Sequence, residues 1–229
     1  MKFFMSKEAL FAVLYSAVIL AGLTRVYFSK TVSVFSLSAN KKVIMLDAGH
    51  GAWDTGKQGL SETIEKDINL SVAEKLQAYL EASGAFVVTT RADDSALGAT
   101  KREDLKTRKD MANELKADIF LSIHQNSFPQ SGARGAQVFY HGKSAESERL
   151  AVTLQEALRT ELDPENRREA KANFDYYLLK NADIPAVIIE CGFLSNPEDA
   201  LNLSREEYQS KVAWAIYAGI IKYFGGEGR

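Results

Sequence analysis

The sequence is poor in cysteine, histidine and proline, with one, three and four of them among 229 residues. The single cysteine, Cys191, excludes a disulfide framework and a thiolate zinc cluster within one chain. The chain also lacks an excess of positive charge. Its formal net charge of -2 at pH 7 gives no electrostatic reason to expect nucleic acid as a partner.

The composition is that of a folded globular protein. Hydrophobic residues make up 46% of the chain and charged residues 25%, which excludes a largely disordered chain. No internal repeat or low-complexity tract is present. The length is sufficient for one domain or two small ones.

The N-terminus differs from the rest because residues 9–23 form a long apolar run. As a helix it spans roughly 22 Å, and continuation to Phe28 reaches the ~30 Å of a bilayer core. Arg25 then lies near the end, where its side chain can reach the headgroups. We predict that residues 1–28 are a membrane anchor or a cleaved signal segment, and favour the anchor because Leu37 fits a cleavage site poorly. A buried N-terminal helix is the third alternative. An anchor or a signal would place the main domain on the extracytoplasmic side.

Residues 29–40 are serine-rich and are predicted to be a linker to a single domain at 41–229. Within that domain, apolar strands alternate with amphipathic helices. Strands are expected at 43–47, 85–91, 117–124, 135–141, 175–179 and 185–190, and helices at about 68–80, 101–116, 144–161 and 206–224. This alternation predicts an α/β fold: a single, mostly parallel mixed sheet of about six strands with helices on both faces.

Polar residues follow three of the expected strands. Asp47 and His50 follow the first, His124 ends the third, and Glu190 ends the last. Because the carboxyl ends of parallel strands meet at one edge of a sheet, these side chains should lie close together. Two histidines at such an edge suggest a metal site.

A catalytic zinc site typically has three protein ligands and one open position. The third ligand should be a carboxylate, because His141 is the only other histidine. Glu62 and Glu65 both lie at the start of the first long helix. Glu65 alone would more often be a carboxylate that stabilises a helix N-terminus, and either histidine alone a core or capping residue.

Four motifs, "DAGHG", "EKDINL", "SIHQNS" and "IIECGFLSN", occur in an order and spacing that resemble the zinc-dependent N-acetylmuramoyl-L-alanine amidases. The resemblance covers roughly residues 41–224. Within that family the chain is most similar to the germination-specific amidases of the spore cortex. "KREDLKTRKDMAN" and "GAQVFYHGKSAESE" support this narrower assignment, as does the absence of a cell-wall-binding repeat.

The resemblance implies that His50, Glu65 and His124 hold one Zn²⁺ per chain and that Glu190 is catalytic. Glu62 matches no position of the family pattern. The family usually has proline where Ala48 stands, and His141 is expected to be a surface residue. The implied partner is peptidoglycan, and some relatives need an activating lipoprotein.

The implied reaction cuts the amide bond between N-acetylmuramic acid and L-alanine, with Glu190 moving the proton from water to the leaving amine. Without that role, Glu190 would need a buried partner. Arg91 and Arg108 are predicted either to pair with it or to bind substrate carboxylates. Asn126, and Arg167 in the basic stretch 166–177, are further predicted substrate-binding residues. Cys191 has no evident orienting partner and is not expected to be a nucleophile.

Several functions remain open from the sequence. The favoured one is removal of stem peptides from spore-cortex peptidoglycan, a step toward muramic-δ-lactam, in the space between the forespore membranes. Alternatives are a vegetative cell-wall amidase, a zinc carboxypeptidase, and a catalytically silent peptidoglycan-binding regulator. Intact motifs at all four site positions argue against the silent regulator.

Overall fold

The structure is a computed structural model that describes residues 39–59 and 63–226. The predicted anchor or signal segment at 1–28 lies outside the described residues, as does most of the predicted linker. The last two linker residues, Ala39 and Asn40, form a turn in which Ala39 is buried. Among the described residues, no helix has the length and apolar character needed to cross a bilayer.

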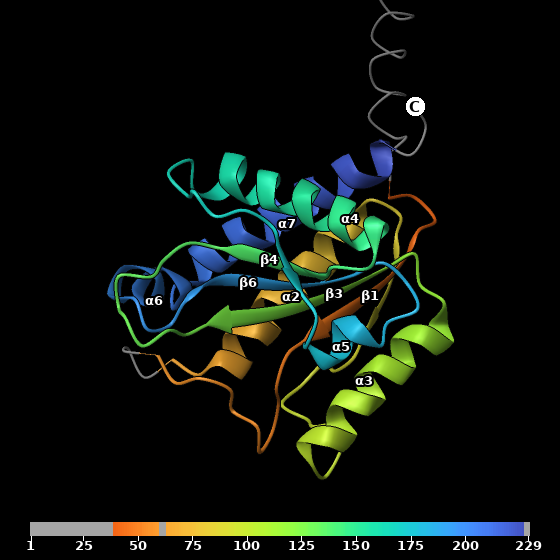
Figure 1. Cartoon of the computed structure of the whole chain (residues 1–229), viewed down its shortest axis with the longest axis horizontal. Helices are drawn as coiled ribbons and strands as arrows, with labels where there is room; N and C mark the ends of the chain where they lie inside the picture. The colour runs from red at the N-terminus through yellow and green to blue at the C-terminus, as the bar shows by residue number, and fades with distance from the viewer. Residues whose placement is uncertain (1–38, 60–62, 227–229) are drawn as a thin grey trace, which may run out of the picture. The chain divides into compact units, whose positions relative to one another are not determined.

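A six-stranded sheet forms the centre of the fold, with the strand order β2-β1-β3-β6-β4-β5 (Figure 1). The strands are β1 (Val43–Ala48), β2 (Phe86–Thr89), β3 (Ile119–Asn126), β4 (Gln137–His141), β5 (Lys171–Asn173) and β6 (Ala186–Phe193). All neighbouring strands run parallel except β4 and β6, which are antiparallel. The predicted fold class, a mostly parallel mixed sheet in an α/β fold, is therefore confirmed.

Helices cover both faces of the sheet. The helices are α2 (Glu65–Ala82), α3 (Lys101–Leu115), α4 (Ala145–Ala157), the π-helical turn η1 (Leu158–Leu162), α5 (Tyr177–Lys180), α6 (Pro197–Leu203) and α7 (Glu206–Gly225). The larger core packs α2, α4 and α7 against one face, and the smaller core packs α3 and α5 against the other. In β1, Ile44 and Leu46 point into the larger core and Met45 into the smaller one. Burial of both faces explains why the central strands are apolar without alternation.

The predicted strand at 175–179 is wrong. This stretch forms a turn and the short helix α5. The sheet still has six strands, because β5 forms within the basic stretch 166–177, at residues where no strand is expected. Asn173 Oδ1 accepts hydrogen bonds from the backbone N–H groups of Asp175 and Tyr176, both at 2.8 Å. This side-chain turn begins α5. The helix then buries the adjacent residues Leu178 and Leu179 in the smaller core.

Candidate active site

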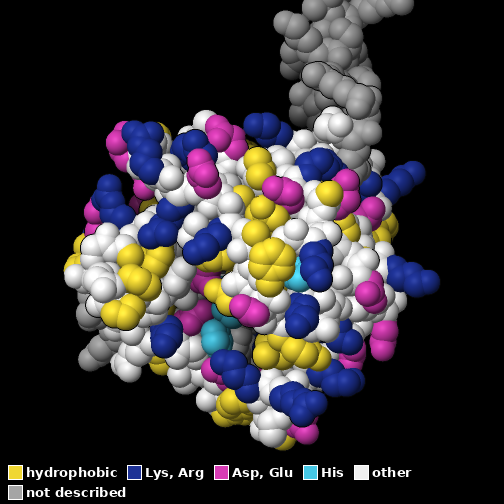
Figure 2. Space-filling model, viewed as in Figure 1, with side chains coloured by type: hydrophobic (Ala, Val, Ile, Leu, Met, Phe, Trp, Pro, Cys, Tyr) yellow, Lys and Arg dark blue, Asp and Glu magenta, His cyan; other side chains and the backbone are white. Residues whose placement is uncertain are grey.

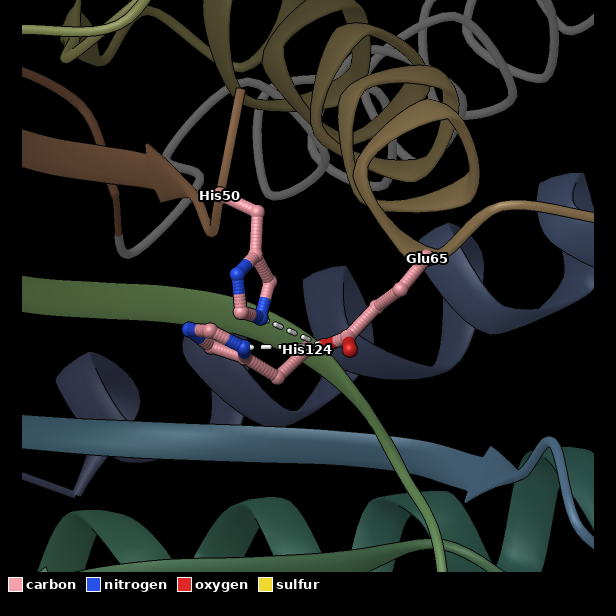
Figure 3. A group of neighbouring side chains, drawn as sticks. All are labelled: His50, Glu65 and His124. Atoms are coloured by element: carbon pink, nitrogen blue, oxygen red, sulfur yellow. Dashed lines mark hydrogen bonds and ion pairs between the residues drawn. The ribbon is translucent and has the colours of Figure 1, made fainter. Parts of the chain in front are cut away.

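The first site residue, His50, lies just beyond β1 in an unusual backbone conformation. Its φ is +63°, in the left-handed region that side chains with a Cβ rarely adopt. A tight turn follows, in which Gly51 and Asp54 exchange backbone hydrogen bonds of 2.9 and 3.0 Å. The conformation aims the imidazole of His50 back across the end of the sheet (Figure 3).

Two buried arginines hold this segment by its carbonyl groups. Arg91 donates to the carbonyl oxygens of Ala48 (2.8 Å) and Gly49 (3.1 Å). Arg108 donates to the carbonyl oxygens of Ala48 (2.9 Å) and His50 (2.7 Å). Their observed contacts therefore fix the backbone that carries His50, and neither arginine forms an ion pair with Glu190 among the described residues.

Asp47, the last charged residue of β1, lies fully buried beneath this segment. Its carboxylate accepts hydrogen bonds from Arg108 Nη1 (2.5 Å), Ser122 Oγ (2.5 Å) and Thr90 Oγ1 (2.7 Å). Burial alone would raise the pKa of Asp47, but the positive charge of Arg108 and the two hydroxyl donors outweigh it and lower the pKa. Asp47 is therefore the buried counter-charge of Arg108.

His50, Glu65 and His124 meet at the carboxyl ends of β1 and β3 and the N-terminus of α2 (Figure 3). Glu65 Oε1 lies 3.1 Å from His50 Nε2 and 3.0 Å from His124 Nδ1. The two rings face each other edge to face, with centroids 4.9 Å apart. One donor atom from each residue lies within 4.8 Å of the others.

Neighbouring groups fix each of these three side chains. His50 Nδ1 lies 2.9 Å from Asp54 Oδ2, the contact by which a carboxylate commonly orients a metal-binding histidine. Glu65 Oε2 accepts a 2.8 Å hydrogen bond from the backbone N–H of Lys57. At Gly49, a Cβ atom would lie 2.2 Å from the His124 ring, so only glycine leaves room for that ring.

The electrostatics of the cluster keep its carboxylate ionised. Burial would raise the pKa of Glu65, but hydrogen bonds and positive charge from His124 and His50 outweigh burial and lower it well below its usual range. Burial would lower the pKa of His124, whereas its hydrogen bond and ion pair with Glu65 raise it.

This donor set fits a zinc ion. Two imidazoles with one carboxylate form a common ligand set of catalytic zinc sites. With zinc bonds of ~2.0–2.1 Å, tetrahedral ligand atoms lie roughly 3.3 Å apart. The separations of Glu65 Oε1 from the two imidazole nitrogens, 3.1 and 3.0 Å, are close to that value.

Glu190 lies on β6 directly beside His124, its register partner on β3. Burial, together with the charge of Glu65, raises its pKa to about 7, although the histidines oppose the shift. Its Oε2 atom has no hydrogen-bond partner among the described residues. A buried carboxylate with a free oxygen and a pKa near neutrality has the properties of a general base.

The comparisons with known proteins agree with this geometry. A family model described as N-acetylmuramoyl-L-alanine amidase matches residues 44–222. The chain belongs to this amidase family. The members of this family are enzymes that act on peptidoglycan.

Individual relatives cover nearly all of the described domain. The chain is 41% identical over 202 residues to the germination-specific N-acetylmuramoyl-L-alanine amidase of Bacillus subtilis, covering 85% of this chain and 84% of the relative. The CwlD amidase of Clostridioides difficile, solved in complex with the GerS lipoprotein, is 46% identical with a TM-score of 0.79, covering 82% of this chain and all of that chain. The catalytic domain of CwlV from Bacillus (Paenibacillus) polymyxa is 33% identical with a TM-score of 0.70. The match covers 80% of this chain and 98% of the CwlV domain.

Two cavities of the amidase share His50, His124 and Glu190 in their linings. One, of about 240 Å³, has an apolar wall of Leu105, Tyr176, Tyr177, Leu178 and Ile188. The other, of about 330 Å³, is polar and is lined by Lys57, Asn126 and Ser127 together with Glu65. Figure 2 shows histidine and acidic side chains at the bottom of a hollow bordered by lysine and arginine side chains.

The predicted substrate-binding residues lie in different surroundings. Asn126 lines the polar cavity and stays a predicted substrate contact. Arg167 is exposed, 3.4 Å from Glu165, and lines a separate cavity, so its role also stays a prediction. Sequence reasoning missed Asp54 and Lys101, which line both active-site cavities. The signal for Asp54 is its place four residues after a histidine ligand candidate, where a carboxylate can orient the ring.

Two further residues named from the sequence, His141 and Cys191, have no part in the described site. His141 ends β4, which runs antiparallel to β6, so it lies at the opposite edge of the sheet, 5.7 Å from the Phe174 ring. Burial raises the pKa of the Cys191 thiol far above its usual range, which leaves it unreactive. Glu62 lies outside the described residues.

Proposed function

We propose that this chain is a zinc-dependent amidase that removes stem peptides from spore-cortex peptidoglycan by cutting the bond between N-acetylmuramic acid and L-alanine. The observation that carries the proposal is the meeting of His50, Glu65 and His124 beside the free carboxylate oxygen of Glu190. Zinc is typical of the family, and Zn²⁺ held by these three residues would supply Lewis-acid polarisation of the amide carbonyl and of water.

The protein side of the reaction rests on Glu190. Its carboxylate accepts a proton from the attacking water and then donates it to the nitrogen of L-alanine as the amide bond breaks. The apolar cavity beside Glu190 leaves room for one part of the substrate, and the polar cavity leaves room for the other. Asp54 holds the ring of His50, and the two arginines hold its backbone.

The test uses the full-length chain, loaded with zinc, on purified cortex peptidoglycan. Mass spectrometry should detect intact stem peptides that begin with L-alanine, and a chelator should abolish their release. Glu190→Gln should lower the rate by at least about 100-fold while zinc content stays stoichiometric. Release of single amino acids would indicate a carboxypeptidase instead, and unchanged release by Glu190→Gln would contradict the assigned general base.

The spore-cortex assignment is supported by the similarity to a germination-specific amidase over 85% of this chain. Its test is genetic. Expression of this chain in an endospore former that lacks its own cortex amidase should restore muramic-δ-lactam to the spore peptidoglycan. Release of stem peptides from vegetative walls, without any muramic-δ-lactam in the spores, would indicate a vegetative amidase.

We also propose that the chain works outside the cytoplasm, in the space between the forespore membranes, anchored by residues 1–28, with a lipoprotein as activating partner. The support for the partner is the solved complex of the CwlD amidase with the GerS lipoprotein. Zinc content and turnover of the full-length chain, measured with and without a candidate lipoprotein, test the dependence. Stoichiometric zinc and full turnover by the chain alone would exclude it.

A further inference from the structure

Outside the zinc-ligand cluster, the side chain of Arg168 is held in a fixed position at the same edge of the sheet. Its Nε donates to the carbonyl oxygen of Arg134 at 2.6 Å, and its Nη1 donates to Gln137 Oε1 at 3.1 Å. The guanidinium lies over the ring of Phe193, 4.4 Å from the ring centroid. Three contacts therefore restrict a side chain that is usually mobile.

Arg168 has no carboxylate partner among the described residues, unlike the two arginines near it. Arg134 pairs with Glu198 at 2.8 Å, and Arg167 pairs with Glu165 at 3.4 Å. None of the ion pairs formed within the described part of the chain includes Arg168, and Asp199 acts on it only at longer range. A partly buried, oriented guanidinium without a counter-charge is suited to bind an anion from outside the chain.

The position of Arg168 connects it to the active site by two routes. Gln137, which it contacts, lies opposite Glu190 in the β4–β6 pair. Phe193, on which it stacks, lies opposite Asn126 in the β3–β6 pair. Neighbouring strands lie ~4.8 Å apart, so one strand spacing and the side chain of Gln137 separate the guanidinium from Glu190.

Arg168 also lines a cavity of about 330 Å³. Two further arginines, Arg134 and Arg167, line the same cavity. Two carboxylates, Asp163 and Glu165, line it as well, so it is suited to a zwitterionic peptide segment rather than to a bare polyanion.

We propose that Arg168 is a substrate-binding residue that recognises the α-carboxylate of the second residue of the stem peptide. This inference rests on the proposed function, since it presupposes that the stem peptide is cut from the glycan beside Glu190. In a stem peptide whose second residue is γ-linked glutamate, the α-carboxylate is free. At ~3.5 Å per extended residue, this α-carboxylate lies roughly 7 Å from the cut bond. That distance brings it within reach of the guanidinium of Arg168.

The test compares two muropeptides that differ only at that group, one with glutamate and one with isoglutamine as the second residue. The full-length, zinc-loaded chain should cleave both. Arg168→Gln should lower kcat/KM at least about tenfold on the glutamate substrate, mainly through KM, because a charge-assisted contact is lost. On the isoglutamine substrate the same variant should stay within about twofold. Arg168→Lys keeps the positive charge and should retain part of the wild-type preference for the glutamate substrate over the isoglutamine substrate.

Arg159→Gln serves as the matched control, because Arg159 already has a carboxylate partner, Glu156 at 3.3 Å, and does not line this cavity. Its ratio of kcat/KM between the two substrates should equal that of the wild type. The ratio does not depend on the fraction of folded enzyme, so a destabilised variant still gives an answer. Equal loss on both substrates by Arg168→Gln, or no loss, would overturn the carboxylate subsite while leaving the amidase function intact. A wild-type chain that cleaves neither substrate would overturn both.

Discussion

At the scale of single residues, Asp47 and Arg108 form a buried ion pair next to the proposed zinc-ligand cluster. Both side chains are almost completely buried, with the Arg108 Nη1–Asp47 Oδ1 contact at 2.5 Å. Asp47→Asn would leave Arg108 with only one of its two carboxylate partners, Asp104. We expect a loss of about 3–5 kcal/mol in the free energy of unfolding, measured by urea denaturation. Glu165→Gln, at an exposed pair, is the control and should have little effect.

The same pair predicts the pH dependence of that loss. Because the pKa of Asp47 is lower in the folded chain than its ordinary value of 3.8, its ionised form stabilises the fold. This contribution is complete above pH ~4 and disappears as the pH falls through the lower folded pKa. The stability difference between wild type and Asp47→Asn should therefore be constant from about pH 5 to 7 and shrink below about pH 4. A difference that grows in acid would contradict the assignment.

Cys191 follows Glu190, the proposed general base, in the sequence but has no part in the proposed reaction. The thiol is fully buried, and burial raises its pKa, so the fraction of reactive thiolate at neutral pH is negligible. We expect no reaction with a thiol reagent in the native chain, and complete reaction after unfolding in denaturant. Cys191→Ala should retain amidase turnover within about threefold. Rapid labelling of the native chain together with loss of turnover would mean that the thiol takes part in the reaction.

At the scale of elements, the close approach of the β1 loop and β3 depends on one glycine. A Cβ at Gly49 would lie 2.2 Å from the His124 ring. Gly49→Ala should displace that ring and weaken zinc binding by roughly 10–100-fold, as loss of supporting contacts does in other sites. Chelator competition measures the affinity. Gly132→Ala is the matched control, because a Cβ at that position would meet nothing within 4 Å, and its zinc affinity should equal that of the wild type.

Elements also explain which parts of the site could be predicted from the sequence. His50 follows the apolar strand β1, whereas His124 and Glu190 each come after an apolar run within β3 and β6. These three parallel strands bring their carboxyl ends to one edge of the sheet. The stretch 175–179 departs from its predicted structure because a side-chain turn at Asn173 decides its conformation, and apolar composition alone does not distinguish a strand from a short buried helix.

The roles of the arginines could not be predicted for a different reason. Arg91 and Arg108 bind carbonyl oxygens of residues about 40 and 60 positions away, and backbone acceptors have no sequence signature. Arg167 and its neighbour Arg168 are equivalent members of one basic stretch when only the sequence is known. Only the contacts with Gln137 and Phe193 distinguish the fixed guanidinium from the exposed one.

At the scale of the whole molecule, the three proposed zinc ligands join parts of the chain that are distant in sequence. They come from the loop after β1, the start of α2 and the end of β3. An ion bound by all three stabilises the folded chain over the unfolded one, which lacks the site, by RT ln(1 + [Zn²⁺]/Kd). At a free zinc concentration of ~100 Kd this is about 2.7 kcal/mol. For a domain of this size the Tm should rise by about 5–10 °C.

Scanning calorimetry of the full-length chain with and without a chelator measures this shift, and two variants separate the site from other zinc effects. Glu65→Gln removes the carboxylate that both histidines contact, so its Tm should no longer depend on zinc. Glu190→Gln leaves all three ligands in place and should keep the full zinc-dependent rise while losing turnover. Because Glu190 lies beside the proposed ligands and is not itself proposed as one, its substitution should abolish turnover without changing the zinc-dependent rise in Tm. A Glu190→Gln variant that loses the zinc-dependent rise would make Glu190 a fourth ligand rather than the general base.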